Sequence, residues 1–207
     1  MPNRHSLIYV KSKVSPCSEH QEDELDFFNQ WISNGFPLIY TRQFGEPLEE
    51  NTIKLGLPYF DAQTNTKYRY SFSVKKPDVK FTAKLPGLKS IFPALVNEVL
   101  FDIGVYGSHA WQYLTGINYV QKTSDVDILI YYENQFSEEI ITQLDLIRAS
   151  YPHKKIDGEI RLPKFGDCQF QELINNTANE LLFKTKNDVV LVSRDAINAE
   201  YPKLAIK

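Results

Sequence analysis

Short apolar runs in the first third of the chain have the pattern of β-strands. Residues 7–10 and 36–42 are largely apolar stretches, and residues 51–57 continue this character. Residues 67–74 alternate strictly, which places one set of side chains on a single face: Tyr68, Tyr70, Phe72 and Val74. These runs predict four strands.

Residues 18–34, between the first two of these runs, repeat apolar side chains at helical spacing. Ser18 and Gln21 form a candidate capping box at the start, and Gly35 is placed to end the helix after Asn34. We expect the apolar positions of this helix to face the core: Leu25, Phe28, Trp31 and Ile32. Strands and helix together predict a small amino-terminal α+β domain.

A passage rich in proline and lysine, residues 75–86, separates this part from the rest and is the candidate linker. We therefore expect one domain at residues 1–80 and a second at residues 81–207. The second domain alternates helix-like and strand-like patterns. In chain order these are a helix at 93–101, a strand at 103–106, a helix at 109–114, a strand at 124–130, a helix at 137–150, a strand at 153–162, and a hairpin of strands 181–184 and 189–192. The fold class predicted for the chain is α+β, with a mixed sheet and helices in the second domain.

Two carboxylates stand in the strand at residues 124–130, separated by one apolar residue. Successive side chains of a strand point to opposite faces, so Asp125 and Asp127 should share a face while Val126 and Ile128 enter the core. Two carboxylates this close repel each other unless a positive charge lies between them, and oxygen ligands of this kind suit Mg²⁺. The strand is a candidate metal site.

A glycine-serine pair follows the preceding strand and is placed to open a helix. The start of a helix presents unpaired backbone N–H groups, and glycine lets a phosphate approach the backbone. Gly107 and Ser108 are therefore candidate phosphate-binding residues. The alternative is an ordinary strand-turn-helix corner with Ser108 as a cap, followed by an edge strand with two solvated aspartates. The order of the two motifs favours a nucleotidyl-transfer site.

A third carboxylate is expected on a neighbouring strand. In residues 153–162, alternation places Ile156, Gly158 and Ile160 on one face and three charged side chains on the other: Asp157, Glu159 and Arg161. Asp157 is the preferred third acid because it is shorter, lies nearer the start of the strand and precedes a glycine. Glu159 remains the alternative.

The stretch from residue 105 to residue 120, which contains Trp-Gln-x-Leu-Thr-Gly-x-x-Tyr-Val, and the Ser-Asp-x-Asp that follows at 124–127 together resemble a known family. They are similar to the signature of the phosphoribosyl-dephospho-CoA transferases, also called malonate decarboxylase holo-acyl-carrier-protein synthases. Looser agreement extends over nearly the whole chain, including Lys184. His109 departs from the pattern, which has a small or aliphatic residue there. The resemblance implies a DNA polymerase β-like nucleotidyltransferase core for the second domain.

The family resemblance also implies a reaction. Its members transfer phosphoribosyl-dephospho-CoA from 2′-(5″-triphosphoribosyl)-3′-dephospho-CoA to a serine of the apo acyl-carrier subunit of malonate decarboxylase, releasing pyrophosphate. We expect Asp125, Asp127 and Asp157 to be the catalytic and metal-binding residues, with Mg²⁺ as cofactor. The expected substrate-binding residues are Gly107 and Ser108 at the phosphates and Lys184 at the leaving group. The alternatives are a nucleotidyltransferase that uses ATP on another acceptor, and an inactive nucleotide-binding module.

Composition indicates the cellular compartment in which the protein acts. The apolar runs are interrupted or too short to span a bilayer, and the amino terminus lacks the apolar core of a signal peptide. Two cysteines, Cys17 and Cys168, support neither a disulfide framework nor a zinc cluster. We expect a cytoplasmic protein with no membrane partner.

Charge is distributed unevenly along the chain. The net charge is -3, but residues 67–89 contain seven basic side chains and one acid, Asp78: Lys67, Arg69, Lys75, Lys76, Lys80, Lys84 and Lys89. Such a patch could steer an acidic carrier protein or a phosphate-rich donor, or be an ordinary solvated strand face. No platform of stacked aromatics and arginines is visible, so no nucleic-acid partner is expected.

Overall fold

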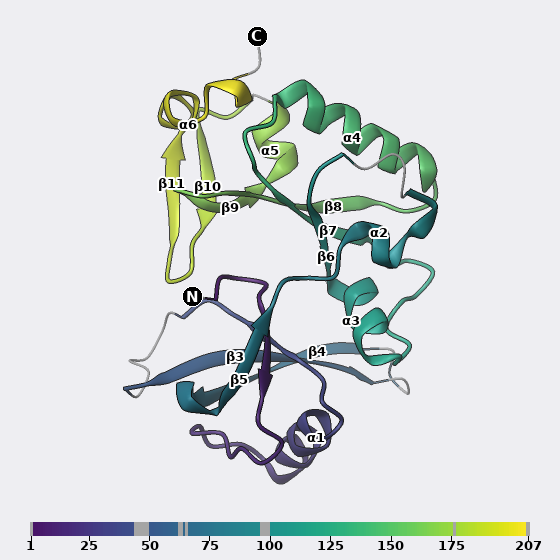
Figure 1. Cartoon of the computed structure of the whole chain (residues 1–207), viewed down its shortest axis with the longest axis vertical. Helices are drawn as coiled ribbons and strands as arrows, with labels where there is room; N and C mark the ends of the chain where they lie inside the picture. Colours follow the sequence, from purple (N-terminus) through teal and green to yellow (C-terminus); the bar gives the residue numbers. More distant parts are fainter. Residues whose placement is uncertain are drawn as a thin grey trace. The chain divides into compact units, whose positions relative to one another are not determined.

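The computed structural model describes residues 2–43, 50–61, 64, 66–95, 100–175 and 177–205. It divides into two compact units, each described here by itself. The first extends to Leu85 and includes Leu114–Tyr119 and Lys186–Asp188, and the second contains the other described residues. Both units combine helices with a sheet, so the predicted α+β class is confirmed (Figure 1).

A five-stranded antiparallel sheet forms the first unit. Its strand order is β4-β3-β2-β1-β5. The strands are β1 (Leu7–Val10), β2 (Leu38–Tyr40), β3 (Thr52–Asp61), β4 (Thr66–Lys75) and β5 (Val79–Ala83). The four predicted strands are present, with β2 shorter and β3 longer than the pattern suggested. Of the side chains predicted to share a face of β4, Phe72 and Val74 are buried, whereas Tyr68 is exposed.

Helix α1 (Glu22–Ser33) is the only α-helix that lies wholly within the described part of the first unit. Its core face is as predicted, with Phe28, Trp31 and Ile32 buried. Gly35 has a φ of 74°, the left-handed conformation that ends helices. The predicted capping box is wrong, because Ser18 Oγ accepts a hydrogen bond from the backbone N–H of Ser73 on β4 instead.

The predicted linker at residues 75–86 is also wrong. A 3₁₀ turn at Lys76–Asp78 leads directly into β5, which pairs antiparallel with β1 and forms one edge of the first sheet. Lysines on an exposed edge strand give the same polar pattern as a linker, because one face of such a strand lies in water. Residues 75–85 therefore belong to the first unit, and Pro86 belongs to the second.

The second unit contains a six-stranded mixed sheet of order β11-β10-β9-β8-β7-β6. Its strands are β6 (Ile103–Tyr106), β7 (Val126–Tyr131), β8 (Ile156–Leu162), β9 (Gly166–Gln169), β10 (Glu180–Lys184) and β11 (Val189–Ser193). Neighbours are antiparallel except β7 and β8, which are parallel. Helix α4 (Ser137–Ser150) connects these two, as a parallel pair requires.

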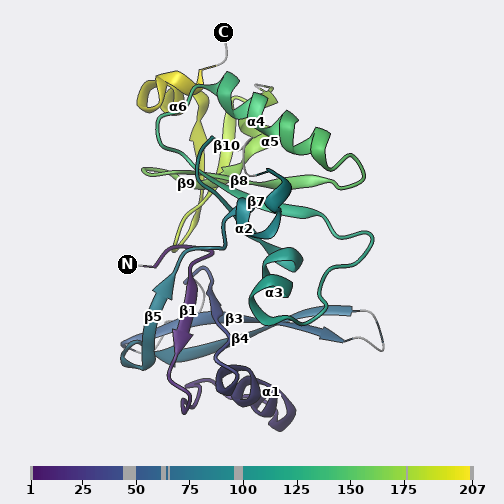
Figure 2. The ribbon, with the colours of Figure 1, turned by 45° about the vertical axis from the view of Figure 1, so that its right-hand side comes forward.

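Helices on one side of this sheet cover its apolar face, where Ile128, Ile156 and Ile160 pack with Ile140 and Leu144 of α4 (Figure 2). The remaining helices of the unit are α2 (Leu88–Ile91), α3 (Gly107–Thr115), α5 (Phe170–Asn175) and α6 (Arg194–Glu200), with 3₁₀ turns at Pro93–Leu95 and Pro202–Leu204. None of the helices in the described ranges is long and apolar enough to cross a membrane.

Most predicted elements of the second unit are present, and four were missed. The strands at β6, β7, β8, β10 and β11 and the helices α3 and α4 match the pattern, whereas β9, α2, α5 and α6 were not foreseen. The helix predicted at residues 93–101 is not formed as such: a 3₁₀ turn stands at its start and Phe101 is not helical. Residues 96–99 of that prediction lie outside the described residues.

Candidate active site

The glycine corner predicted between β6 and α3 is present. Gly107 has a φ of 67°, which L side chains rarely adopt, and it is the first residue of α3. A Cβ atom built on Gly107 would lie 2.0 Å from Oδ2 of Asp127. The Asp127 carboxylate therefore lies directly against the start of helix α3, where the positive end of the helix dipole favours negative charge.

Sheet pairing brings the predicted acids of β7 and β8 together. Asp127 and Asp157 are direct partners in the parallel register of the two strands, so their side chains leave the same face of the sheet. Val126 and Ile128, their neighbours on β7, are 1% and 0% exposed, as the alternation predicts. Asp125 immediately precedes β7 and shares the face of Asp127 by the same alternation.

Lys155 links the third acid to the first. Its Nζ lies 2.9 Å from Oδ2 of Asp157 and 3.3 Å from Oδ2 of Asp125. One ammonium thus contacts both carboxylates, which places all three predicted acids at one end of strands β7 and β8. These hydrogen bonds, that to Asp157 first and that to Asp125 second, raise the pKa of Lys155.

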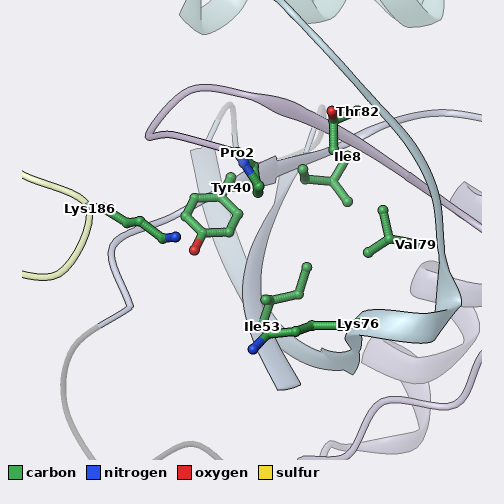
Figure 3. Close-up of a pocket in the computed structure, with 8 residues that line it drawn as sticks. All are labelled: Pro2, Ile8, Tyr40, Ile53, Lys76, Val79, Thr82 and Lys186. Carbon is green, nitrogen blue, oxygen red and sulfur yellow. The ribbon is translucent and has the colours of Figure 1, made fainter. Parts of the chain in front are cut away.

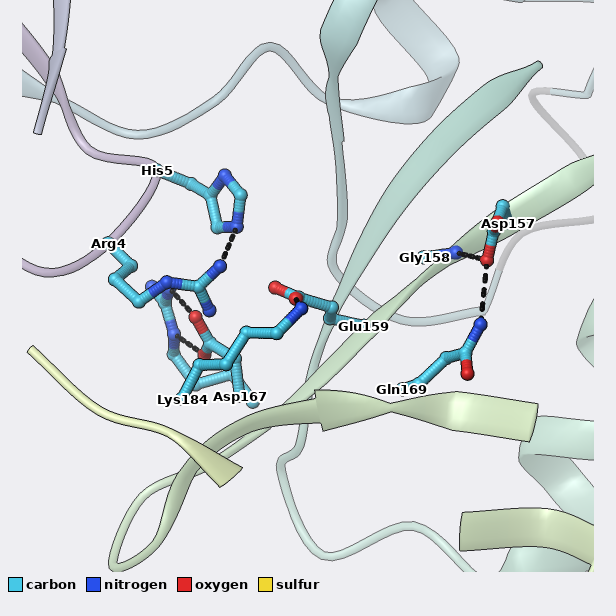
Figure 4. A network of polar contacts seen from close by, with 9 residues as sticks. Arg4, His5, Asp157, Gly158, Glu159, Asp167, Gln169 and Lys184 are labelled. Atoms are coloured by element: carbon cyan, nitrogen blue, oxygen red, sulfur yellow. Dashed lines mark hydrogen bonds and ion pairs between the residues drawn. The ribbon is translucent and has the colours of Figure 1, made fainter. Parts of the chain in front are cut away.

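The Asp157 carboxylate has three donors. Burial alone would raise its pKa, but hydrogen bonds from Lys155, from the backbone N–H of Gly158 and from the side chain of Gln169 outweigh burial and hold the pKa below its usual value. The Gly158 bond is 2.8 Å and the Gln169 bond is 3.3 Å long (Figure 4). Asp157 is therefore ionised and fixed in orientation at neutral pH.

Gly158 makes room for this arrangement. Its φ is 150°, and a Cβ atom at this position would lie 1.9 Å from the backbone oxygen of Ile128. Because backbone cannot move aside as the end of a side chain can, only glycine fits between β7 and β8 here. The close approach of these two strands is what sets Asp157 beside Asp127.

Glu159, the alternative third acid, lies on the same face of β8 but has a different environment. It is 6% exposed, and its carboxylate accepts a hydrogen bond of 2.7 Å from Nζ of Lys184 (Figure 4). It is opposite Leu129 in the register, whereas Asp157 is opposite Asp127. The register of β7 and β8 therefore places Asp157, and not Glu159, beside Asp127. Lys184 contacts Glu159.

A second ion pair lies farther along the same face of the sheet. Arg161 of β8 donates two hydrogen bonds to Asp167 of β9, one of 2.6 Å from Nε to Oδ1 and one of 2.9 Å from a terminal guanidinium nitrogen to Oδ2. The Asp167 side chain is 2% exposed, so the pair is a buried, bidentate one. The charges farther along β8 are thus balanced within the sheet.

The residues of helix α3 that follow Gly107 differ in how deeply their side chains are buried. Ser108 is half-buried in the first turn of α3, and the His109 ring packs on Phe92 with centroids 5.2 Å apart. His109, the residue that departs from the family pattern, is therefore half-buried. Trp111 is buried and Tyr113 is exposed.

The donor set of the three aspartates fits Mg²⁺. All are carboxylates, which are the hard oxygen ligands that this ion binds in proteins, and they lie at one end of neighbouring strands. An ammonium group already bridges two of them, so a positive charge is accommodated at this position. Asp125, Asp127 and Asp157 are the residues that would hold the ion.

A cavity of about 330 Å³ lies in the first unit (Figure 3). Its floor includes the buried side chains of Ile8, Tyr40 and Ile53, and Lys186 places its ammonium 5.7 Å from the centre of the Tyr40 ring. None of the site residues predicted from the sequence lines it. The cavity is a feature separate from the carboxylates of the second unit.

Two residues of the site were not predicted. One is Lys155, although a lysine two positions before an acid on a strand shares the face of that acid. Gln169 carries no comparable signal, because it reaches Asp157 through β9, a strand that the pattern did not show.

Fold and site together define a class of protein: an α+β protein whose mixed sheet presents three carboxylates beside a helix start. Residues 75–195 match the family model described as the phosphoribosyl-dephospho-CoA transferase MdcG C-terminal domain. The chain belongs to this family and is a transferase. Every site residue predicted from the sequence lies within the matched segment.

Curated relatives extend the match to almost the whole chain. A protein of Bradyrhizobium diazoefficiens named phosphoribosyl-dephospho-CoA transferase is 28% identical, with 93% of this chain and 91% of the relative covered. A protein of the same name from Xanthomonas axonopodis pv. citri is 27% identical over 95% of this chain and 97% of the relative. No solved structure matches the chain significantly.

Proposed function

We propose that this transferase moves phosphoribosyl-dephospho-CoA from 2′-(5″-triphosphoribosyl)-3′-dephospho-CoA to a serine of the apo acyl-carrier subunit of malonate decarboxylase. The serine oxygen forms a bond to the α-phosphorus, the bond between that phosphorus and the pyrophosphate oxygen breaks, and the hydroxyl proton is released. The observation that carries the proposal is the meeting of Asp125, Asp127 and Asp157 at the glycine corner, within the segment that matches the family.

We propose Mg²⁺ as the cofactor, held by Asp125, Asp127 and Asp157. When bound, the ion would neutralise charge on the triphosphate and lower the pKa of the attacking hydroxyl. The protein contributes the positions of these ligands. Gly158 and Gln169 orient Asp157, and the corner at Gly107 holds Asp127 against the helix start.

The start of helix α3 is the proposed phosphate site. Gly107 and Ser108 stand in its first turn, where backbone N–H groups point toward the start of the helix and the helix dipole favours an anion. The absence of a side chain at Gly107 leaves room for the Asp127 carboxylate beside this helix start. Lys184 is the proposed contact for the leaving group: its ammonium has three donors, Glu159 accepts from one, and 40% of the side chain is exposed.

Exposed basic side chains of the first unit support an acidic protein acceptor. Six of the seven basic residues between positions 67 and 89 belong to this unit and are exposed, on or beside β4 and β5, which form opposite edges of the sheet: Lys67, Arg69, Lys75, Lys76, Lys80 and Lys84. Exposed charge of one sign raises the rate at which a partner of opposite sign associates. We propose the cytoplasm as the compartment, since both cysteines are free thiols.

Intact mass of the carrier subunit tests this function. The enzyme is incubated with apo carrier, the triphosphoribosyl donor and Mg²⁺, and we expect the carrier to gain the mass of one phosphoribosyl-dephospho-CoA group. A carrier whose acceptor serine is replaced by alanine is the matched control and should stay unmodified. A carrier that gains mass with ATP as the only donor, and not with the triphosphoribosyl donor, would replace the proposal with an ATP-dependent nucleotidyltransferase.

A further inference from the structure

Lys155 occupies a central place among the site carboxylates. It directly precedes β8, and its ammonium contacts Asp157 at 2.9 Å and Asp125 at 3.3 Å. Asp157 in turn is the register partner of Asp127. The positive charge of Lys155 therefore lies between carboxylates that would otherwise repel each other.

The other cations on this face of β8 are engaged farther along the strand. Lys184 contacts Glu159 and Arg161 contacts Asp167, and both of these acids are buried. Among the contacts that the structure describes at Asp125 and Asp157, Lys155 is the cationic one.

The ammonium of Lys155 can exchange its carboxylate partners for other ligands. Its side chain is 61% exposed and Asp125 is 38% exposed, so water competes for both groups. Exposed ion pairs are weak, and a long lysine side chain can leave one partner for another at little cost. A divalent ion at the same carboxylates carries twice the charge and competes for the same oxygens.

We propose that Lys155 is an exchangeable counter-ion of this site: it neutralises Asp125 and Asp157 when no divalent ion is bound, and otherwise turns its ammonium to the phosphate oxygens of the donor. This inference rests on the proposed function and adds a role that the family match does not give. Lys155 is a positioning residue for the carboxylates in the first state and a substrate contact in the second. Its two contacts keep the acids at their spacing before the ion arrives.

This role has two consequences of opposite sign. Removing the charge of Lys155 removes a competitor, so divalent ions should bind the free enzyme more tightly. The same change removes a donor to phosphate, so transfer should become slower. A purely structural surface lysine would change neither quantity, and a lysine that only assists substrate binding would leave the metal affinity of the free enzyme unchanged.

Calorimetric titration of the full chain with MgCl₂, without donor or carrier, tests the first consequence. We expect Lys155→Gln to bind Mg²⁺ about fivefold more tightly than the unchanged protein. Lys164→Gln is the matched control, because Lys164 also forms an ion pair, with Glu200, and is 59% exposed. The control should bind Mg²⁺ with unchanged affinity. Thermal unfolding in chelator confirms that both variants are folded.

Carrier loading tests the second consequence. Lys155→Gln should lower kcat/KM for the triphosphoribosyl donor at saturating Mg²⁺ by at least about tenfold, and Lys155→Arg should restore much of it. Equal or weaker Mg²⁺ binding by Lys155→Gln, or unchanged kcat/KM, would overturn the inference while leaving the proposed function intact. Conversely, tighter Mg²⁺ binding with loading from ATP alone would refute the proposed donor but not the counter-ion role.

Discussion

Oδ2 of Asp127 occupies the space in which a side chain on residue 107 would begin, 2.0 Å from the position of a Cβ atom on Gly107. Gly107 is therefore tied to the site by two independent constraints, a left-handed φ of 67° and the nearby carboxylate. The first is a matter of backbone strain, and the second concerns the position of a proposed metal ligand. Substitutions can separate them.

Gly107→Ala should reduce transfer far more than stability. The left-handed backbone costs an alanine about 1–2 kcal/mol, and the added methyl group displaces the Asp127 carboxylate. We expect kcat/KM for carrier loading to fall by about a hundredfold, because small displacements of catalytic groups are costly. Gly35→Ala is the control: its φ is 74° but nothing lies within 4 Å, so it should lose similar stability in urea unfolding and keep its activity. Equal activity of the two variants would contradict this role of Gly107.

Replacing Asp125 or Asp127 with alanine should abolish transfer and leave the fold intact. Both side chains are partly solvated and project from the sheet face opposite Val126, so their loss opens no cavity in the core. Intact mass of the carrier measures transfer, and circular dichroism checks the fold. Asp145→Ala serves as the control, since that exposed acid forms a local ion pair with Arg148 of the same helix. Substantial residual turnover in either site variant would refute the catalytic role.

Removal of divalent ions should stop pyrophosphate release. We expect a chelator to lower the rate by about a hundredfold or more, because charge on the triphosphate would be left without its counter-ions. Added Mg²⁺ in excess of the chelator should restore it, which shows that the enzyme was not damaged. Release of pyrophosphate at an undiminished rate in chelator would count against a metal role for the three aspartates.

Local pattern predicted the elements that carry the site, since the strands β6, β7 and β8 and the start of α3 each have a clear apolar period. Alternation alone placed Asp125 with Asp127 and identified the face of Asp157. It could not decide between Asp157 and Glu159, because that depends on the register of two strands about 30 residues apart, which Gly158 permits by its lack of a side chain.

The errors arise where different structures share one polarity pattern. A lysine-rich edge strand looks like a linker, and β9, with four residues and a glycine, is too short to show a period. Missing β9 meant missing Gln169, which reaches Asp157 from that strand. Ser18 stands where the sequence predicts a helix cap, but its hydroxyl accepts a hydrogen bond from Ser73 on β4. This contact depends on tertiary structure, which the local sequence does not show.

The two cysteines should differ strongly in reactivity. Cys168 is 0% exposed, and burial, followed by the nearby charge of Asp167, raises the pKa of its thiol far above the usual value. The thiolate is the reactive form, so Cys168 should be inert in the folded protein, whereas the half-buried Cys17 should react. Iodoacetamide treatment at pH 8 should therefore add one label to the native chain and two in denaturant, as read by mass spectrometry. Rapid double labelling of the native chain would contradict the burial of Cys168.

The ion pair of Lys184 with Glu159 allows a structural role of this lysine to be separated from a role in substrate binding. The Glu159 side chain is 7% exposed, so Lys184→Met removes an ion-pair and hydrogen-bond partner of a buried carboxylate and should destabilise the fold by about 1–3 kcal/mol. Glu159→Gln keeps a neutral acceptor at that position. The double variant should therefore be more stable than Lys184→Met alone, and urea unfolding of the four proteins gives the coupling energy.

Transfer kinetics of the same four proteins complete the separation. If Lys184 contacts the leaving group, the double variant regains stability but not kcat/KM, because the ammonium is still missing. If Lys184 serves only Glu159, activity returns together with stability. We expect the first result, since 40% of the Lys184 side chain is exposed and its ammonium has donors beyond the one that Glu159 accepts. Recovery of kcat/KM in the double variant would remove Lys184 from the substrate-binding residues and leave it as the partner of a buried acid.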